Sequence, residues 1–259
     1  CAWGMVPYFA HAADPAPLEG GAEVNWRYGS ERSILMSEFW VPFLQDGESV
    51  LYGDARLMGD DQDNNEFNLG LGYREIVDAP LLGRGVAGVH GWFDRRITAR
   101  GSTFHQATLG AEWLGEEFDI LANGYMPLSS KQRYTTGVNA VGTPYLAGTG
   151  IYVERSTAGE VIEEPQAGFD IEFGWQVPFA QELTDSARIY GGGYYFEGDE
   201  SENIAGWRTR LAVDVTSDIQ LGGRFQRDDE RGSQGFLEAT IRFPFGQKKS
   251  FRDHGLYAR

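Results

Sequence analysis

The sequence predicts an all-β protein, a transmembrane antiparallel up-and-down β-barrel of about twelve strands. Three observations lead to this prediction. Apolar and polar side chains alternate with a period of two, the period of a strand. Glycine makes up 35 of 259 residues and aromatic residues 14%, and both suit curved strands better than helices. No apolar stretch approaches the roughly 18 residues of a membrane-spanning helix, so a chain like this one can cross a membrane only as a closed barrel.

The alternation begins at Ala22 and continues to Phe245. The most regular expected strands cover 22–28, 66–74, 169–179, 207–215, 219–226 and 237–245. Less regular ones cover Ser33–Phe43, Ser49–Met58, Gly85–Arg96, Phe104–Trp113, Phe118–Leu128 and Ala187–Phe196. Together they give about twelve strands of roughly 9–11 residues, as transmembrane strands require. An even number returns the C-terminus to the side where the N-terminus began.

A soluble sandwich also alternates, and two features favour a barrel. Aromatic residues end the apolar faces, as in the interfacial girdles of membrane barrels. They are Trp26, Tyr28, Phe43, Tyr73, Trp113, Phe179, Phe225, Phe243 and Phe245. Tight turns (45–48, 115–117, 216–218) also alternate with longer loops (59–65, 97–102, 197–205, 227–234) and one very long loop, 129–166. Short turns on one side and long loops on the other are typical of bacterial outer-membrane barrels.

Composition excludes several functions. Acidic residues outnumber basic ones by 38 to 22, for a net charge of −16, and such a chain repels nucleic acid. The single cysteine, Cys1, excludes an internal disulfide and a cysteine-based metal site. Glycine pairs such as Gly70 and Gly72 lie in expected strands and precede no helix, so they are not nucleotide-binding loops. We predict no cofactor and no metal.

Residues 1–20 are expected to be an exported N-terminal segment. Ala10-His11-Ala12 resembles a signal-peptidase site, which indicates a remnant of a signal peptide. Alternatively, Cys1 is the lipid-bearing first residue of a lipoprotein, or the segment is a disordered tail. The first two interpretations both imply export.

The middle of the chain resembles the β-domain of the inverse autotransporters, the intimin and invasin family of adhesins. The resemblance rests on the order of four blocks, Gly91-Trp92-Phe93-Asp94, Leu109-Gly110-Ala111-Glu112-Trp113, Ala122-Asn123-Gly124-Tyr125 and Gly168-Phe169-Asp170-Ile171. The opening strands, with Ala22-Glu23-Val24-Asn25 and Val41-Pro42-Phe43, resemble it as well. The sequence departs from the family pattern in its long 129–166 loop, and neither a peptidoglycan-binding module nor a passenger is seen.

The resemblance implies an outer-membrane barrel over 21–246 and, over 247–259, the start of a linker that re-enters the lumen. The function it implies is type V secretion: the barrel exports and displays an adhesin-type C-terminal passenger and then anchors it, without ATP. Gly246 could be the hinge of the linker or simply the end of a strand. The main alternative is a passive outer-membrane pore or structural barrel without passenger, in which 129–166 folds inward as a constriction.

Charged residues of both signs are expected on the lumen face, where they can pair with one another. They would hold the linker, or only stabilise the barrel wall. They are Asp54, Arg56, Asp170, Glu172, Arg208, Arg210, Asp214, Arg224, Glu238 and Arg242.

The last expected strand is interpreted as the assembly signal read by the outer-membrane insertion machinery. It places Leu237, Ala239, Ile241, Phe243 and Phe245 on one face. Any lipid-facing strand could end in this way. The other expected partners are outer-membrane lipid, lipopolysaccharide, periplasmic chaperones and the passenger.

Acidic clusters at 60–66, 197–202 and 228–230 could bind calcium, but they lack the spacing of a calcium loop and solvated loops are the simpler explanation. Catalysis has little support, and we predict no enzyme. No serine lies in a Gly-x-Ser-x-Gly elbow. His90 is expected to form a hydrogen bond within the wall, and His105 with Asp94 is the best catalytic pair that the sequence offers.

Overall fold

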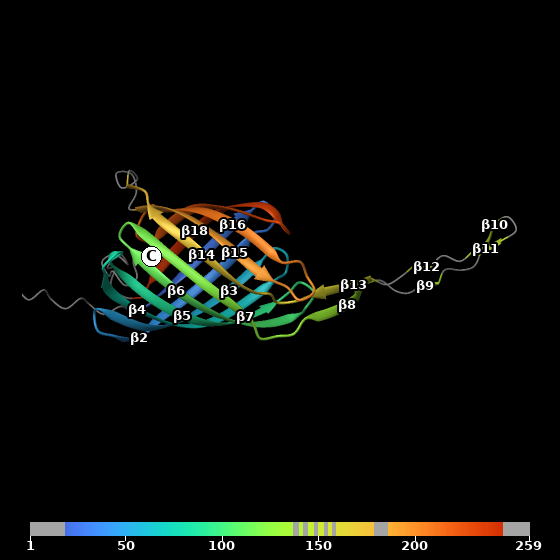
Figure 1. Ribbon diagram of the computed structural model, residues 1–259, viewed down its shortest axis with the longest axis horizontal. Coiled ribbons are helices and arrows are strands. Elements are labelled where there is room, and N and C mark those ends of the chain that lie inside the picture. Colours follow the sequence, from blue (N-terminus) through green and yellow to red (C-terminus); the bar gives the residue numbers. More distant parts are fainter. Residues whose placement is uncertain are drawn as a thin grey trace, which may run out of the picture.

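The computed structural model of the chain is a closed antiparallel β-barrel (Figure 1). It describes residues 19–136, 140–141, 145–147, 150–152, 155–156, 159–178 and 186–245. Twelve strands form the wall, each hydrogen-bonded to two neighbours, and the described residues contain no α-helix. The predicted fold class is confirmed.

The first seven wall strands are β1 (Gly21–Gly29), β2 (Ile34–Gln45), β3 (Ser49–Asp60), β4 (Asn65–Ala79), β5 (Gly83–Ile97), β6 (Thr103–Gly115) and β7 (Phe118–Pro127). The other five are β14 (Ala167–Gln176), β15 (Ser186–Glu197), β16 (Ile204–Asp214), β17 (Ile219–Asp228) and β18 (Gly232–Pro244). The six less regular expected strands match β2, β3, β5, β6, β7 and β15 to within two residues at each end. The largest differences are in β4, which continues to Ala79 instead of ending near residue 74, and in β18, which begins at Gly232 instead of residue 237.

The barrel closes where the first strand meets the last. Gly21 pairs with Pro244 and Gly29 with Phe236. Across this seam, Asn25 donates a hydrogen bond from Nδ2 to Oγ1 of Thr240 at 2.7 Å, and both residues are buried. Because β1 begins and β18 ends at the same end of the barrel, we call it the terminal end and the opposite one the hairpin end.

Between β7 and β14 the chain forms a long hairpin. Its described parts are β8 (Gln132–Thr136) paired with β13 (Gly159–Glu163), β9 (Ala140–Val141) with β12 (Arg155–Ser156), and β10 (Tyr145–Ala147) with β11 (Gly150–Tyr152). The hairpin extends away from the barrel (Figure 1). The alternative in which the whole of this segment folds into the lumen is therefore wrong, although residues 162–166 at its base line the lumen cavity.

The expected tight turns all lie at the terminal end and the expected longer connections, including the long hairpin, at the hairpin end, but four of the expected loops are shorter than predicted. At the hairpin end, the connections 61–64, 98–102, 198–203 and 229–231 are hardly longer than the terminal-end turns 46–48, 80–82, 116–117 and 215–218. The strands continue into residues that were expected to be loop, because paired strands can extend beyond a membrane into water without losing backbone hydrogen bonds.

Proline and a small apolar cluster mark local departures from the regular wall. Pro42 lies within β2 next to a register shift between Pro42 and Leu44, where a missing N–H donor does least harm. Inside the barrel, Val50, Tyr52, Val86 and Leu114 form a buried apolar cluster. The lumen, which was expected to be lined by charged residues, therefore also has an apolar section.

Candidate functional site in the barrel lumen

The two faces of the wall have opposite chemistry. Outward-facing apolar side chains are exposed, for example Leu109 at 72% and Leu237 at 69%. Inward-facing charged side chains are buried, for example Asp170 at 4% and Glu172 at 3%. A soluble protein would place these classes the other way round, whereas a membrane barrel faces lipid outside and a polar lumen inside. The described residues contain no helix that could span a membrane.

Most of the expected aromatic girdle is exposed on the outer face. Trp26, Tyr28, Phe43, Tyr73 and Phe225 are 40% exposed or more, and so are Phe243 and Phe245. Trp113 is an exception at 7% exposure. Its ring packs closely over Gly85, where a Cβ would lie 2.6 Å from the ring. Phe179 lies outside the described residues.

Charged residues of β14 and β16 form an ion-pair network in the lumen. Arg208 contacts Asp170 at 3.0 Å and Glu172 at 3.2 Å. Arg210 contacts Glu172 at 2.9 Å and lies 3.5 Å from the centre of the Tyr190 ring. Each of these buried charges therefore has a partner of opposite sign or an aromatic face.

The other predicted lumen charges are also paired. Arg224 contacts Glu238 at 2.8 Å, and Arg242 contacts Asp214 at 3.0 Å. Across β2 and β3, Arg56 contacts Glu38 at 2.9 Å and Asp54 at 3.5 Å. The guanidinium of Arg56 also lies 3.8 Å from the ring of Trp92, which fills the space above Gly70.

Four residues of the resemblance blocks meet around Asp170. Its carboxylate accepts hydrogen bonds from Tyr125 Oη at 2.5 Å and from Asn123 Nδ2 at 3.1 Å. Nε2 of His90 lies 3.1 Å from Oδ1 of Asn123. Gly110 makes room for this contact, since a Cβ there would lie 2.5 Å from Asn123 Oδ1 and closer still to His90.

The remaining block residues are distributed over both faces. Asp94 accepts a hydrogen bond from Thr108 at 2.5 Å, and Glu112 forms an ion pair with Arg74 at 2.6 Å. Phe169, at 56% exposure, faces outward, and so by strand alternation do Gly91 and Gly124. Arg74, Tyr52 and Asn68 also face the lumen and were not among the predicted residues, although their inward position in the strand alternation identifies them.

His105 and Asp94 lie on opposite faces of the wall. The register of β5 and β6 pairs His105 with Arg95 and Asp94 with Gln106. The ring of His105 stacks on the outward-facing Phe93, with ring centroids 5.5 Å apart, whereas Asp94 lines the lumen cavity. The two side chains therefore cannot act together.

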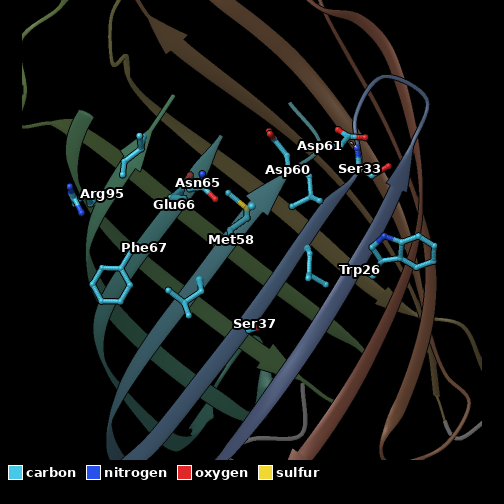
Figure 2. A pocket seen from close by; sticks show the side chains of 15 residues that line it. Trp26, Ser33, Ser37, Met58, Asp60, Asp61, Asn65, Glu66, Phe67 and Arg95 are labelled. Atoms are coloured by element: carbon cyan, nitrogen blue, oxygen red, sulfur yellow. Dashed lines mark hydrogen bonds between the residues drawn. The ribbon is translucent and has the colours of Figure 1, made fainter. Parts of the chain in front are cut away.

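The lumen contains a cavity of about 810 Å³ that opens towards the hairpin end. The wall of β3 to β7 contributes most of its lining, with Arg56, Asn68, Trp92, Gln106 and Tyr125 among the residues. A second hollow, of about 590 Å³, lies beside Trp26, Leu57 and Phe67 below the 61–64 turn (Figure 2). Most of its side chains belong to the exposed face, so it is a feature of the outer surface.

Charged side chains hold the base of the hairpin to the barrel loops. Glu200 lies 2.5 Å from both Lys131 and Arg133. The hydrogen bond from Lys131 lowers the pKa of Glu200, and the same bond raises the pKa of Lys131. On the β13 side, Glu163 accepts hydrogen bonds from Thr98 at 3.0 Å and from Ser102.

The acidic clusters form no metal site in the described part of the chain, which holds no group of three or more His, Cys, Asp or Glu that could bind an ion. Asp60 instead accepts hydrogen bonds from Asn64 and Gln62, and Asp61 accepts one from the backbone of Ser33. The final strand β18 exposes Leu237, Ile241 and Phe243 on its outer face. The 1–18 segment, Gly246 and residues 247–259 lie outside the described residues.

Comparisons with known proteins agree with this architecture. The family model "Inverse autotransporter, beta-domain" matches residues 19–250. A solved membrane-protein structure described as "Unveiling the Mechanism Behind the in-meso Crystallization of Membrane Proteins" is similar at a TM-score of 0.66 and 18% identity, over 89% of this chain and 86% of that one. The COG4313 outer membrane channel from Pseudomonas putida F1 is similar at a TM-score of 0.53 and 12% identity, over 93% of this chain and 100% of that one. No curated protein matches.

Proposed function

The chain belongs to the inverse autotransporter β-domain family, and from this premise we propose that it exports and anchors a C-terminal adhesin-type passenger. As a member of this family, the barrel lies in the bacterial outer membrane, in contact with lipid. In the proposed function, the hairpin end faces the cell surface and the terminal end the periplasm. The segment after β18 turns back, crosses the lumen, and carries the passenger outside.

The observation that carries the proposal is the polar, partly open lumen of a wall whose first strand begins where its last strand ends. Gly21 and Pro244 are paired, so the segment that follows β18 starts at the terminal end. The cavity of about 810 Å³ lies in the path from there to the hairpin end. The charged side chains of the lumen keep it wet, and many of them are compensated by ion pairs.

Two parts of the proposal concern partners and chemistry. The exposed apolar face of β18, ending in Phe243 and Phe245, would be the strand that the outer-membrane insertion machinery reads after periplasmic chaperones deliver the chain. We propose no catalytic activity, since His105 and Asp94 are separated by the wall. Lipopolysaccharide is proposed as the outer-leaflet neighbour of the hairpin end.

Surface display tests the export function. A small folded domain with an epitope is fused after Arg259, and antibody binding is measured on intact cells and on cells with a permeabilised outer membrane. Export predicts equal labelling of both. Labelling only after permeabilisation, together with large and steady openings of the purified barrel in planar bilayers, would instead identify a passive pore. A periplasmic marker protein in the same cells controls for leakage.

A further inference from the structure

We infer that a polypeptide crossing the lumen lies along the wall of β4, β5 and β6 and is held there through its backbone by polar side chains that form no ion pair in the wall. The inference rests on the proposed function, and it adds which part of the wall makes contact and by what chemistry. Neither follows from the family, because both depend on how this chain distributes its lumen residues.

The wall of β14 to β18 has little hydrogen-bonding capacity left for another chain. Glu172 binds both Arg208 and Arg210, and Arg224 binds Glu238. Even the amides there are paired, because Gln226 donates to Gln234 at 2.8 Å. A segment lying on this wall would have to break charge-assisted bonds, which are about twice as strong as neutral ones.

The wall of β4 to β6 has more hydrogen-bonding capacity left near the hairpin end, although Arg74 and Glu112 form an ion pair nearer the terminal end. The strand register places Asn68, Asp94 and Gln106 side by side in one row, and all three line the cavity. Asp94 accepts a hydrogen bond from Thr108 at 2.5 Å and forms no ion pair within the described part of the chain, so its carboxylate can also accept one from a backbone N–H of a second chain. A primary amide such as Gln106 can both donate to and accept from a peptide group.

The spacing of the wall also suits an extended chain. The next row towards the terminal end contains Trp92 and Thr108, two residues along each strand, or about 6.8 Å away. An extended polypeptide repeats its backbone groups at about the same distance. Trp92 and Tyr125 add flat apolar surface to the same cavity, so extended segments of different sequence could be accommodated.

Disulfide cross-linking in the outer membrane of intact cells tests the inference. In the full-length protein with Cys1→Ser, a cysteine is placed at Gln106 or, as the matched control, at Gln226, which faces the lumen from β17. A second cysteine is moved through positions 248–252, beginning with Ser250→Cys. We expect cross-links to position 106 to exceed those to position 226 by about tenfold, a preference of about 1.4 kcal/mol.

The outcomes separate the inference from the proposed function. Equal cross-linking at both positions, or a preference for position 226, overturns the inference and leaves export intact. No cross-link at either position, in a barrel that still migrates as a folded species in unheated gels, overturns both. As a second measurement, Gln106→Leu should raise the open-channel current of the purified protein, because the bound segment loosens, whereas Gln226→Leu should not. An unchanged current in both variants contradicts the role of Gln106.

Discussion

Replacing Asp170 by alanine should destabilise the barrel by about 3 kcal/mol, for reasons that the lumen network makes explicit. Asp170 is 4% exposed and accepts hydrogen bonds from Tyr125, Asn123 and Arg208. Its removal leaves two neutral donors unsatisfied, at about 1–1.5 kcal/mol each. Arg208 keeps Glu172 at 3.2 Å, so the full penalty of about 3–5 kcal/mol for an orphaned buried charge does not apply.

The assay is reversible urea unfolding of the purified barrel in lipid vesicles, followed by tryptophan fluorescence. A loss of about 3 kcal/mol lowers the folding equilibrium constant by about two orders of magnitude. Asp170→Asn keeps an acceptor oxygen and should cost less than the alanine variant. Asp229→Ala, in the exposed 229–231 turn, is the control and should change the free energy by less than about 0.5 kcal/mol. A cost below about 1 kcal/mol for Asp170→Ala would refute the view that this network stabilises the wall.

Gly110→Ala should lower the free energy of unfolding by about 1–3 kcal/mol, because the added Cβ crowds His90 and Asn123, and a second change, His90→Ala, should restore part of the loss. The control is Gly91→Ala, whose Cβ would meet nothing nearer than 3.4 Å. Equal effects of the two glycine variants in the same unfolding assay would contradict the steric argument. Leu109→Arg should lower the free energy of unfolding in lipid by about 2–4 kcal/mol, because that face meets lipid. Leu81→Arg, in a turn and 95% exposed, should change it little. Similar unfolding free energies for the two variants would argue against a lipid-facing wall. Because the pKa of Glu200 is lowered, its ion pair with Lys131 is present above the ordinary carboxylate pKa and is lost as the pH falls through the lowered value. Amide exchange of 131–136, corrected for intrinsic rates, should therefore rise over that pH range in the wild type and be high at all pH values in Glu200→Gln. A flat wild-type profile would show that this ion pair does not hold the base of the hairpin.

The positions of the strands, and the face of the wall to which each side chain points, could be predicted from the sequence, because successive residues of a strand point to opposite faces. Asp54 and Arg56 share a parity, as do Asp170 and Glu172, so their common face followed directly from the sequence. The same rule applied across a turn fails without the register. His105 and Asp94 are close in sequence across one turn, but the register of β5 and β6 places them on opposite faces of the wall.

The convergence of Asn123 and Asp170 could not be predicted either. The two residues are 47 positions apart, and they meet only because the intervening hairpin returns β14 to the edge of β7. Loop lengths were misjudged for a different reason. Acidic residues such as Asp60 and Asp228 look like loop residues by composition, yet they end strands because they cap the adjacent turns through hydrogen bonds.

The seam between β1 and β18 has a kinetic consequence. Asn25 and Thr240 are separated by 215 positions in the chain, so no earlier pairing brings them near except the stepwise addition of every intervening strand. Closing so long a loop is slow compared with forming the neighbouring hairpins. Until it happens, the sheet has two open edges that can pair with other chains. Closure of the seam therefore removes the two edges at which a partly assembled barrel could aggregate.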